Sequence, residues 1–204
     1  MRYQSVEVFP TTILKVDVED AITAEDREMM VRSVDQLYDR GDWDKDPLRP
    51  PYQTYPVLFL DQAPPIWKKL RKTFIDSCYL YLKVVEDVHQ FQDQLEILQV
   101  RAWCYKSDRA TKQQRNNPMH THRPSYLSGV YYLKLPDNSE DTVGTEFGDI
   151  KGMTLGAARD IVISNGLNCW SIFPGGMPHR ALQMDSELPR YVIAADAFVG
   201  IKLL

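Results

Sequence analysis

Residues 118–133 read PMHTHRPSYLSGVYYL, and they are the most informative part of the chain about its fold. It carries two histidines, His120 and His122, shortly before an apolar run with one valine and two tyrosines. Such a run is typical of a buried strand. Because residues i and i+2 of an extended chain point to the same side, the two imidazoles can converge on one point.

A third histidine and an arginine lie further along the chain. His179 follows an apolar strand and a Gly-Gly turn in WSIFPGGMPH. Neutral imidazole is a common metal donor, so two histidines on one strand and a third from a distant strand predict an open-faced metal site. Arg190 opens the apolar run RYVIAADAFV, where an inward guanidinium needs an anion. That anion is either a protein acid such as Asp185 or Glu187, or a ligand carboxylate.

Around these residues the sequence predicts short strands separated by Gly, Pro, Asn and Asp. The expected strands are 6–18, interrupted at Pro10, and then 95–105, 119–123, 126–135, 159–164, 168–173 and 190–199.

Two helices are expected in the N-terminal part. The first begins near Thr23, which forms a capping box with Asp26, and ends at Gly41. The second covers residues 65–89 and opens with a proline. The predicted apolar positions are Met29, Met30, Val34 and Leu37 in the first helix, and Ile66, Leu70, Phe74, Cys78, Tyr81, Leu82 and Val85 in the second.

Helices first and short strands afterwards are the order of an α+β domain with an antiparallel β-core. We expect the helices to pack on the outer face of that core. The 204 residues, of which 44% are hydrophobic, suit a single domain. Residues 1–94 form its helical part with a supporting strand, and residues 95–204 carry the β-core and the metal site.

Composition excludes several classes of function. The chain has 24 lysines and arginines against 28 acids, for a formal net charge of −4. The basic residues are scattered, so a nucleic-acid partner is not expected. No apolar run is long enough to span a bilayer, and the N-terminus does not resemble a signal peptide, so we expect a cytoplasmic protein without a membrane partner.

From Leu95 to Val199 the chain resembles the Fe(II)/2-oxoglutarate-dependent oxygenase superfamily. It is most similar to a branch common in bacteria and phage, with an H-x-H motif, SGVYYL, FP-x4-H and a trailing arginine. The matching pieces here are His120-Thr121-His122, Ser128 to Leu133, Phe173-Pro174 through His179, and Arg190, together with the opening VFPTTIL.

The resemblance implies a double-stranded β-helix, or jelly roll, that holds Fe(II) and uses 2-oxoglutarate as co-substrate. Carried over by position, His120 and His179 are the two histidine ligands, and Arg190 binds the far carboxylate of 2-oxoglutarate. Most of the superfamily has an acid where this chain has His122. The third ligand is therefore His122 or, as alternatives, Asp149 or Glu146.

The sequence also differs from the family pattern in the hydroxyl group that is expected beside the arginine. Many relatives carry a serine two residues after it, and this chain has Val192. Ser128 or Tyr132, on one side of the same strand, would then supply the hydroxyl and complete the cofactor-binding group. The pocket is expected to be lined by Trp103, Tyr105, Tyr131 and Trp170, and covered by the proline-rich loop 42–56.

The expected function is a 2-oxoglutarate-dependent iron dioxygenase that hydroxylates a second substrate. One alternative is a cupin-like three-histidine dioxygenase that needs no keto acid. Another is a non-catalytic β-domain that binds a metal, a small ligand or a partner protein.

Overall fold

Two helices precede the main strands of the chain. The computed structural model describes residues 2–8, 11–43, 53–85, 95–107, 118–136, 144–148, 161–164, 166–182 and 186–201. Helix α1 (Ala24–Asp39) begins after Thr23, whose hydroxyl accepts from the Asp26 backbone while the Asp26 carboxylate accepts from the Thr23 backbone. This reciprocal pair confirms the capping box. Gly41 follows the helix with a φ of 74°, which glycine adopts without a Cβ penalty.

Helix α2 (Pro65–Val84) begins at the expected proline, and residues 86–89 of the predicted helix lie outside the described residues. Its buried apolar side chains are Trp67, Leu70, Phe74, Cys78, Tyr81 and Leu82. In α1, Met30, Val31 and Val34 are buried. Met29, which was predicted to be an apolar position of this helix, is 39% exposed. The buried face of α1 is therefore shifted by about one residue from the predicted one.

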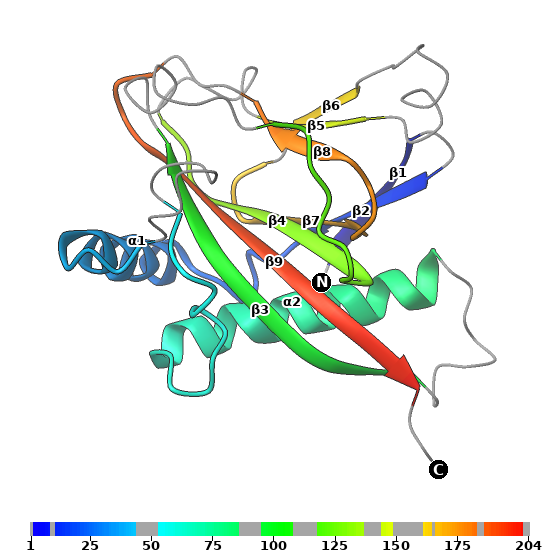
Figure 1. Cartoon of the computed structure of the whole chain (residues 1–204), viewed down its shortest axis with the longest axis horizontal. Coiled ribbons are helices and arrows are strands. Elements are labelled where there is room, and N and C mark those ends of the chain that lie inside the picture. The colour runs from blue at the N-terminus through cyan, green and yellow to red at the C-terminus, as the bar shows by residue number, and fades with distance from the viewer. Residues whose placement is uncertain are drawn as a thin grey trace.

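The strands form two antiparallel sheets. The larger has the order β1-β2-β7-β4-β9-β3 and the smaller the order β6-β5-β8 (Figure 1). Their bounds are β1 (Arg2–Val8), β2 (Thr11–Asp17), β3 (Leu95–Ser107), β4 (Leu127–Lys134), β5 (Gly144–Phe147), β6 (Ile161–Ser164), β7 (Cys169–Pro174), β8 (His179–Ala181) and β9 (Arg190–Ile201).

Three strand predictions need correction. The expected strand over 6–18 is two strands, β1 and β2, which pair with each other. Residues 119–123 are not a regular strand, because only His120 makes a bridge there. Strands β5 and β8 were missed, since each is three or four residues long and is paired mainly with distant parts of the chain.

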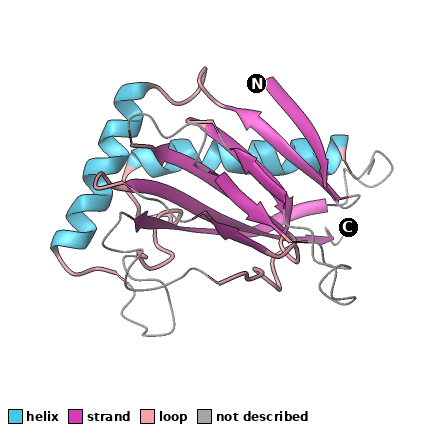
Figure 2. Cartoon of the chain, turned by 90° about the horizontal axis from the view of Figure 1, so that it is seen from above, coloured by secondary structure: helices cyan, strands magenta, loops and turns pink. Residues whose placement is uncertain are grey.

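The two faces of the larger sheet have different neighbours, because side chains alternate along each strand. In β9 the odd-numbered residues from Tyr191 to Ala197 belong to an apolar cluster shared with α1 and α2. Val192 belongs to a second cluster, which it shares with Phe147 and Ile163 of the smaller sheet. The helices therefore cover one face of the larger sheet and the smaller sheet lies against the other (Figure 2).

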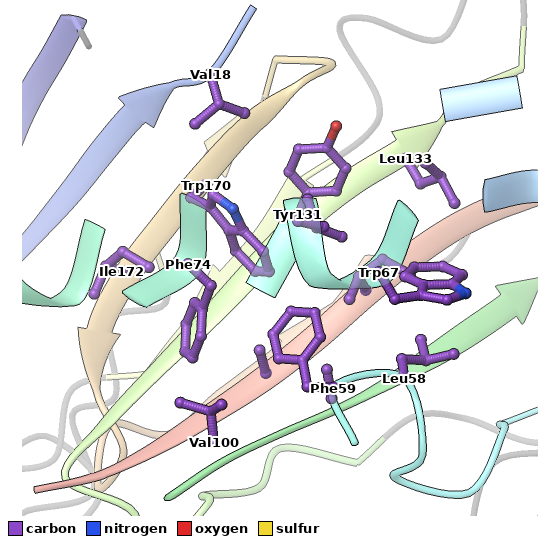
Figure 3. Packing of buried hydrophobic residues seen from close by; sticks show 14 of the residues in the cluster. Val18, Leu58, Phe59, Trp67, Phe74, Val100, Tyr131, Leu133, Trp170 and Ile172 are labelled. Carbon is purple, nitrogen blue, oxygen red and sulfur yellow. The ribbon is translucent and has the colours of Figure 1, made fainter. Parts of the chain in front are cut away.

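On the helix side, Phe74 of α2 packs against Trp170 of β7, with ring centroids 4.9 Å apart (Figure 3). The glycine of the SGVYYL motif makes this contact possible. A Cβ at Gly129 would lie 2.7 Å from Phe74 Cε2 and 2.9 Å from Ile172 Cδ1, closer than such carbons approach. Gly129 thus lets α2 lie directly on the sheet.

Within the described residues, neither helix combines the length and the apolar composition that crossing a membrane requires.

Candidate active site

Three histidines meet between the two sheets. His120 and His122 lie in the segment before β4, and His179 is the first residue of β8. The backbones of His120 and His179 exchange hydrogen bonds of 3.0 and 2.9 Å, which holds the two segments together. The ring centroids lie 4.7 to 5.2 Å apart, and one nitrogen from each ring lies within 4.8 Å of the others. The structure thus brings together the three residues that the sequence singled out.

Each of these imidazoles has an acceptor on its Nδ1 atom. The three Nδ1 contacts are His120 to the Pro118 carbonyl at 2.9 Å, His122 to Asp196 Oδ1 at 2.8 Å, and His179 to the Met177 carbonyl at 2.9 Å. A carbonyl or carboxylate oxygen requires Nδ1 to carry the proton in the neutral ring. The lone pair is then on Nε2, which is the arrangement that a metal-binding histidine needs.

Burial favours the neutral form of the His120 and His179 rings. It lowers the pKa of His179 to about 3, with repulsion from His122 and His120 as the next causes. Burial also lowers the pKa of His120. A neutral imidazole can donate its lone pair to a cation near neutral pH, whereas an imidazolium cannot. The cluster therefore suits a divalent metal that accepts nitrogen donors.

The two acids considered as alternative ligands have different positions. Glu146 of β5 is the register partner of Arg180 and is ion-paired with its guanidinium. Because Phe147 is the partner of His179, alternation turns Glu146 to the other face of the strand. Asp149 lies outside the described residues. Among the described residues, only the three histidines form a group that could hold a metal.

A cavity of about 380 Å³ opens in front of the histidines. The described residues that line it are Gln53, Pro56, Arg101, Trp103, Tyr105, Pro118, His120, Thr121, His122, Arg123, Val130, Thr145, His179, Ala181, Val192, Ala194 and Asp196. Two of them, Gln53 and Pro56, come from the loop expected to cover the pocket, of which residues 44–52 lie outside the described residues.

Only two of the four expected aromatic residues line this cavity. Trp103 and Tyr105 of β3 do so. Tyr131 and Trp170 are fully buried on the opposite face of the larger sheet, where they pack against each other and beneath α2 (Figure 3). The prediction that Tyr131 and Trp170 line the pocket was wrong, because it did not assign them to a face of their strands.

Arg190 is a buried cation at the start of β9. Its side chain is 2% exposed, and Nη1 has no hydrogen-bond partner among the described residues. Its Nε donates to the Ser107 hydroxyl at 3.2 Å. Burial lowers the pKa of Arg190, although nearby Tyr132 and Tyr105 raise it in part. Within the described residues, which include the proposed partner Glu187, no acid forms an ion pair with Arg190; Asp185, the other proposed partner, lies outside them.

The hydroxyls near Arg190 are arranged differently from the expectation. Ser128 donates to Asp196 at 2.8 Å and so does not support the arginine. Tyr132 lies near Arg190, and its hydroxyl contacts the Thr145 hydroxyl at 3.2 Å. The hydroxyl that does bind Arg190 belongs to Ser107, its cross-strand partner. Sequence reasoning could not find Ser107, because its relevance depends on the register between β3 and β9.

Asp196 is the second residue that the sequence did not reveal. It is 0% exposed and accepts hydrogen bonds from His122, Ser128 and Arg101. Burial alone would raise the pKa of Asp196, but these bonds lower it overall, with that from His122 the strongest. The one feature of the sequence that could have indicated its role is an acidic residue six positions after the start of an apolar strand.

Comparison with known proteins identifies the fold. No protein-family model matches the sequence, and no curated protein matches it significantly. AviO1 from Streptomyces viridochromogenes Tue57 matches 91% of this chain and 89% of its own, with a TM-score of 0.60 and 12% identity. A Trichoplax adhaerens prolyl hydroxylase, in complex with a peptide of the hypoxia inducible factor, matches 91% and 83%, with a TM-score of 0.56 and 14% identity.

A third match is SnoN, a non-heme alpha-ketoglutarate-dependent epimerase from nogalamycin biosynthesis. It covers 92% of this chain and 76% of its own, with a TM-score of 0.50 and 9% identity. The chain therefore has the jelly-roll fold of the Fe(II)/2-oxoglutarate-dependent oxygenases, as the resemblance predicted. At these identities the likeness concerns the fold, and function must be inferred from the residues of the site.

Proposed function

We propose that this chain is an Fe(II)- and 2-oxoglutarate-dependent oxygenase that oxidises a second substrate. The observation that carries the proposal is a buried guanidinium, Arg190, on the same face of the larger sheet as the histidine cluster. Val192, Ala194 and Asp196, at alternate positions after it, line the cavity. Arg190 has no anionic partner among the described residues, and a cation in this setting is costly to bury unless an anion, here that of a ligand, meets it.

The three histidines are the proposed metal ligands. Their donor set fits a divalent iron, because each Nδ1 is bonded and each Nε2 can point toward a common cation. When bound, Fe(II) would activate dioxygen, the oxidant of the reaction: one oxygen atom would go into the succinate left after decarboxylation of 2-oxoglutarate, and the other would oxidise the second substrate. The protein holds the donors, orients the reactants and excludes water.

Arg190 is proposed to bind the far carboxylate of 2-oxoglutarate. Its planar guanidinium can form two parallel hydrogen bonds with a carboxylate, and Nη1 is available for one of them. Ser107 fixes the orientation through Nε. Because the group is almost fully buried, the charge interaction is little screened by water.

The second substrate is proposed to occupy the cavity beside Trp103 and Tyr105. Both side chains are half-buried and line the cavity, so they offer apolar contact area next to the histidines. A cavity of about 380 Å³ lies within the range for small-molecule sites.

Isothermal titration calorimetry under anaerobic conditions tests this function. Protein loaded with Mn(II) as an inert substitute for iron should bind 2-oxoglutarate, and metal-free protein should bind it much more weakly. Arg190→Ala should abolish the binding. Arg180→Ala is the matched control, because Arg180 is ion-paired with Glu146 and should leave the binding intact. Metal-loaded protein that binds no 2-oxoglutarate would overturn the proposal.

The three-histidine donor set also favours the second candidate, a dioxygenase that needs no keto acid. In that case the protein binds the metal, 2-oxoglutarate produces no heat, and Arg190→Ala changes neither result. A protein that binds no metal at all would instead support a non-catalytic domain.

A further inference from the structure

The carboxylate of Asp196 lies directly behind one of the proposed metal ligands. Its Oδ1 accepts from His122 Nδ1 and from the Ser128 hydroxyl, each at 2.8 Å. Its Oδ2 accepts from Arg101 Nε at 2.9 Å and from Nη2 at 2.8 Å. Both oxygens are thus occupied by donors, so the carboxylate is held in one orientation.

Asp196 distinguishes His122 from the other two histidines. His120 and His179 donate to neutral backbone carbonyls, whereas His122 donates to a buried carboxylate. His122 is also the residue that replaces the acid expected from the resemblance.

We propose that Asp196 is a positioning residue for the metal centre, which restores through His122 the negative charge that the H-x-H motif lacks. This inference rests on the proposed metal site. The carboxylate fixes the tautomer with the proton on Nδ1, so that Nε2 is the donor, and it makes the imidazole a stronger donor. The negative charge then lies on Asp196, one side chain further from the metal than an acidic ligand at position 122 would place it. The atom that binds the metal is still a nitrogen.

The register of the sheet explains why this arrangement forms. Asp196 is the direct cross-strand partner of Arg101 on β3 and of Ser128 on β4. Neighbouring strands thus place both supporting groups beside it. The same register also offers a purely structural role, in which the carboxylate only pairs with Arg101 and ties β3 to β9.

Co(II) binding separates the two roles without any measurement of activity. We expect Asp196→Asn, which keeps the shape and an acceptor oxygen but loses the charge, to raise the dissociation constant for Co(II) about 10- to 100-fold. The visible absorption of bound Co(II) should change as well, because the His122 donor is altered. Arg101→Met is the matched control, since it removes the cross-strand ion pair and leaves the bond to His122. It should lower the melting temperature and change the Co(II) dissociation constant less than about threefold.

A purely structural Asp196 predicts a different pattern. Both variants would then lower the melting temperature, and both would leave the Co(II) dissociation constant and spectrum unchanged. This result would overturn the inference. Wild-type protein that binds no Co(II) would instead overturn the proposed function, so the two failures are distinguishable.

A double-variant cycle tests whether Asp196 acts through His122. In a His122→Ala background, Asp196→Asn should have little further effect on Co(II) affinity. An equally large loss in that background would contradict the inference. If Asp196→Asn does not fold, Ser128→Ala carries the test. It leaves Asp196 Oδ1 to His122 alone, which makes this oxygen a stronger acceptor, and it should tighten Co(II) binding about fivefold, outside the change allowed for Arg101→Met. Unchanged affinity in a folded Ser128→Ala protein would then count against the role.

Discussion

Replacing Arg190 with methionine should make the ligand-free protein more stable and abolish its response to 2-oxoglutarate. The guanidinium is 2% exposed, and its Nη1 atom has no partner among the described residues. A buried charged group without a partner costs about 1–3 kcal/mol, and the bond to Ser107 returns about 1 kcal/mol. The methionine side chain is also long and unbranched, so it can fill much of the same space without a charge. The free energy of unfolding should therefore rise by as much as about 2 kcal/mol, or up to roughly 8 °C in melting temperature.

Addition of 2-oxoglutarate should make the wild type more stable than Arg190→Met. At about 100 times its dissociation constant, the ligand stabilises the wild type by about 2.7 kcal/mol. The Arg190→Met protein should gain nothing, so the wild type becomes the more stable of the two. Urea unfolding of Mn(II)-loaded protein, followed by circular dichroism with and without 2-oxoglutarate, measures both differences.

Arg180→Met is the control for this experiment. Arg180 is half-exposed and paired with buried Glu146, so its loss should destabilise the protein with and without ligand. The gain from 2-oxoglutarate should remain. If Arg190→Met is less stable than the wild type without ligand, groups of the protein itself already pair with the guanidinium. If it still gains stability from 2-oxoglutarate, Arg190 does not bind the co-substrate.

Three further predictions concern the metal and the fold. His179→Ala should abolish stoichiometric Fe(II) or Co(II) binding, measured by metal analysis after gel filtration, while the far-ultraviolet circular dichroism stays unchanged; full metal retention would refute the ligand role. Gly129→Ala should cost about 1–3 kcal/mol in urea unfolding because its Cβ clashes beneath α2. Gly166→Ala, whose Cβ has no atom of the described residues within 4 Å, should cost less than about 0.5 kcal/mol, and equal costs would contradict this packing. Asp26→Asn should cost about 1 kcal/mol near neutral pH by weakening the cap. Because bonds from Lys69 and the Thr23 backbone hold the Asp26 pKa below its usual value, this loss should disappear as pH falls through the lowered pKa, which urea unfolding at several pH values would show.

Features with a local physical cause were predictable from the sequence. The capping box at Thr23 and the proline that opens α2 mark helix starts, because they satisfy or avoid the free N–H groups there. The spacing of His120 and His122 in an extended segment placed both rings on one side, as the structure confirms. A third ring from His179 could be anticipated only through the resemblance and the apolar strand before it.

Features that depend on pairing between distant segments were missed. Strands β5 and β8 have four and three residues, too few to carry a recognisable alternation. Tyr131 and Trp170 lie in two strands that were predicted correctly, β4 and β7, but the sequence does not say which face of a doubly buried strand meets the helices. Glu146 remained an alternative ligand for the same reason. Its register with Arg180 shows that its side chain lies on the face of the strand away from His179.

The two helices, the longer strands, the histidine and arginine candidates and the apolar segments of the core could all be predicted from the amino-acid sequence alone. These follow from periodicity, capping and residue chemistry, which act over a few neighbouring residues. By contrast, the hydrogen bonds from Arg190 to Ser107 and from His122 to Asp196 could be found only in the three-dimensional structure. Both contacts join residues more than 70 positions apart. They exist because the register between strands, set by the packing of the whole sheet, places these side chains within hydrogen-bonding distance.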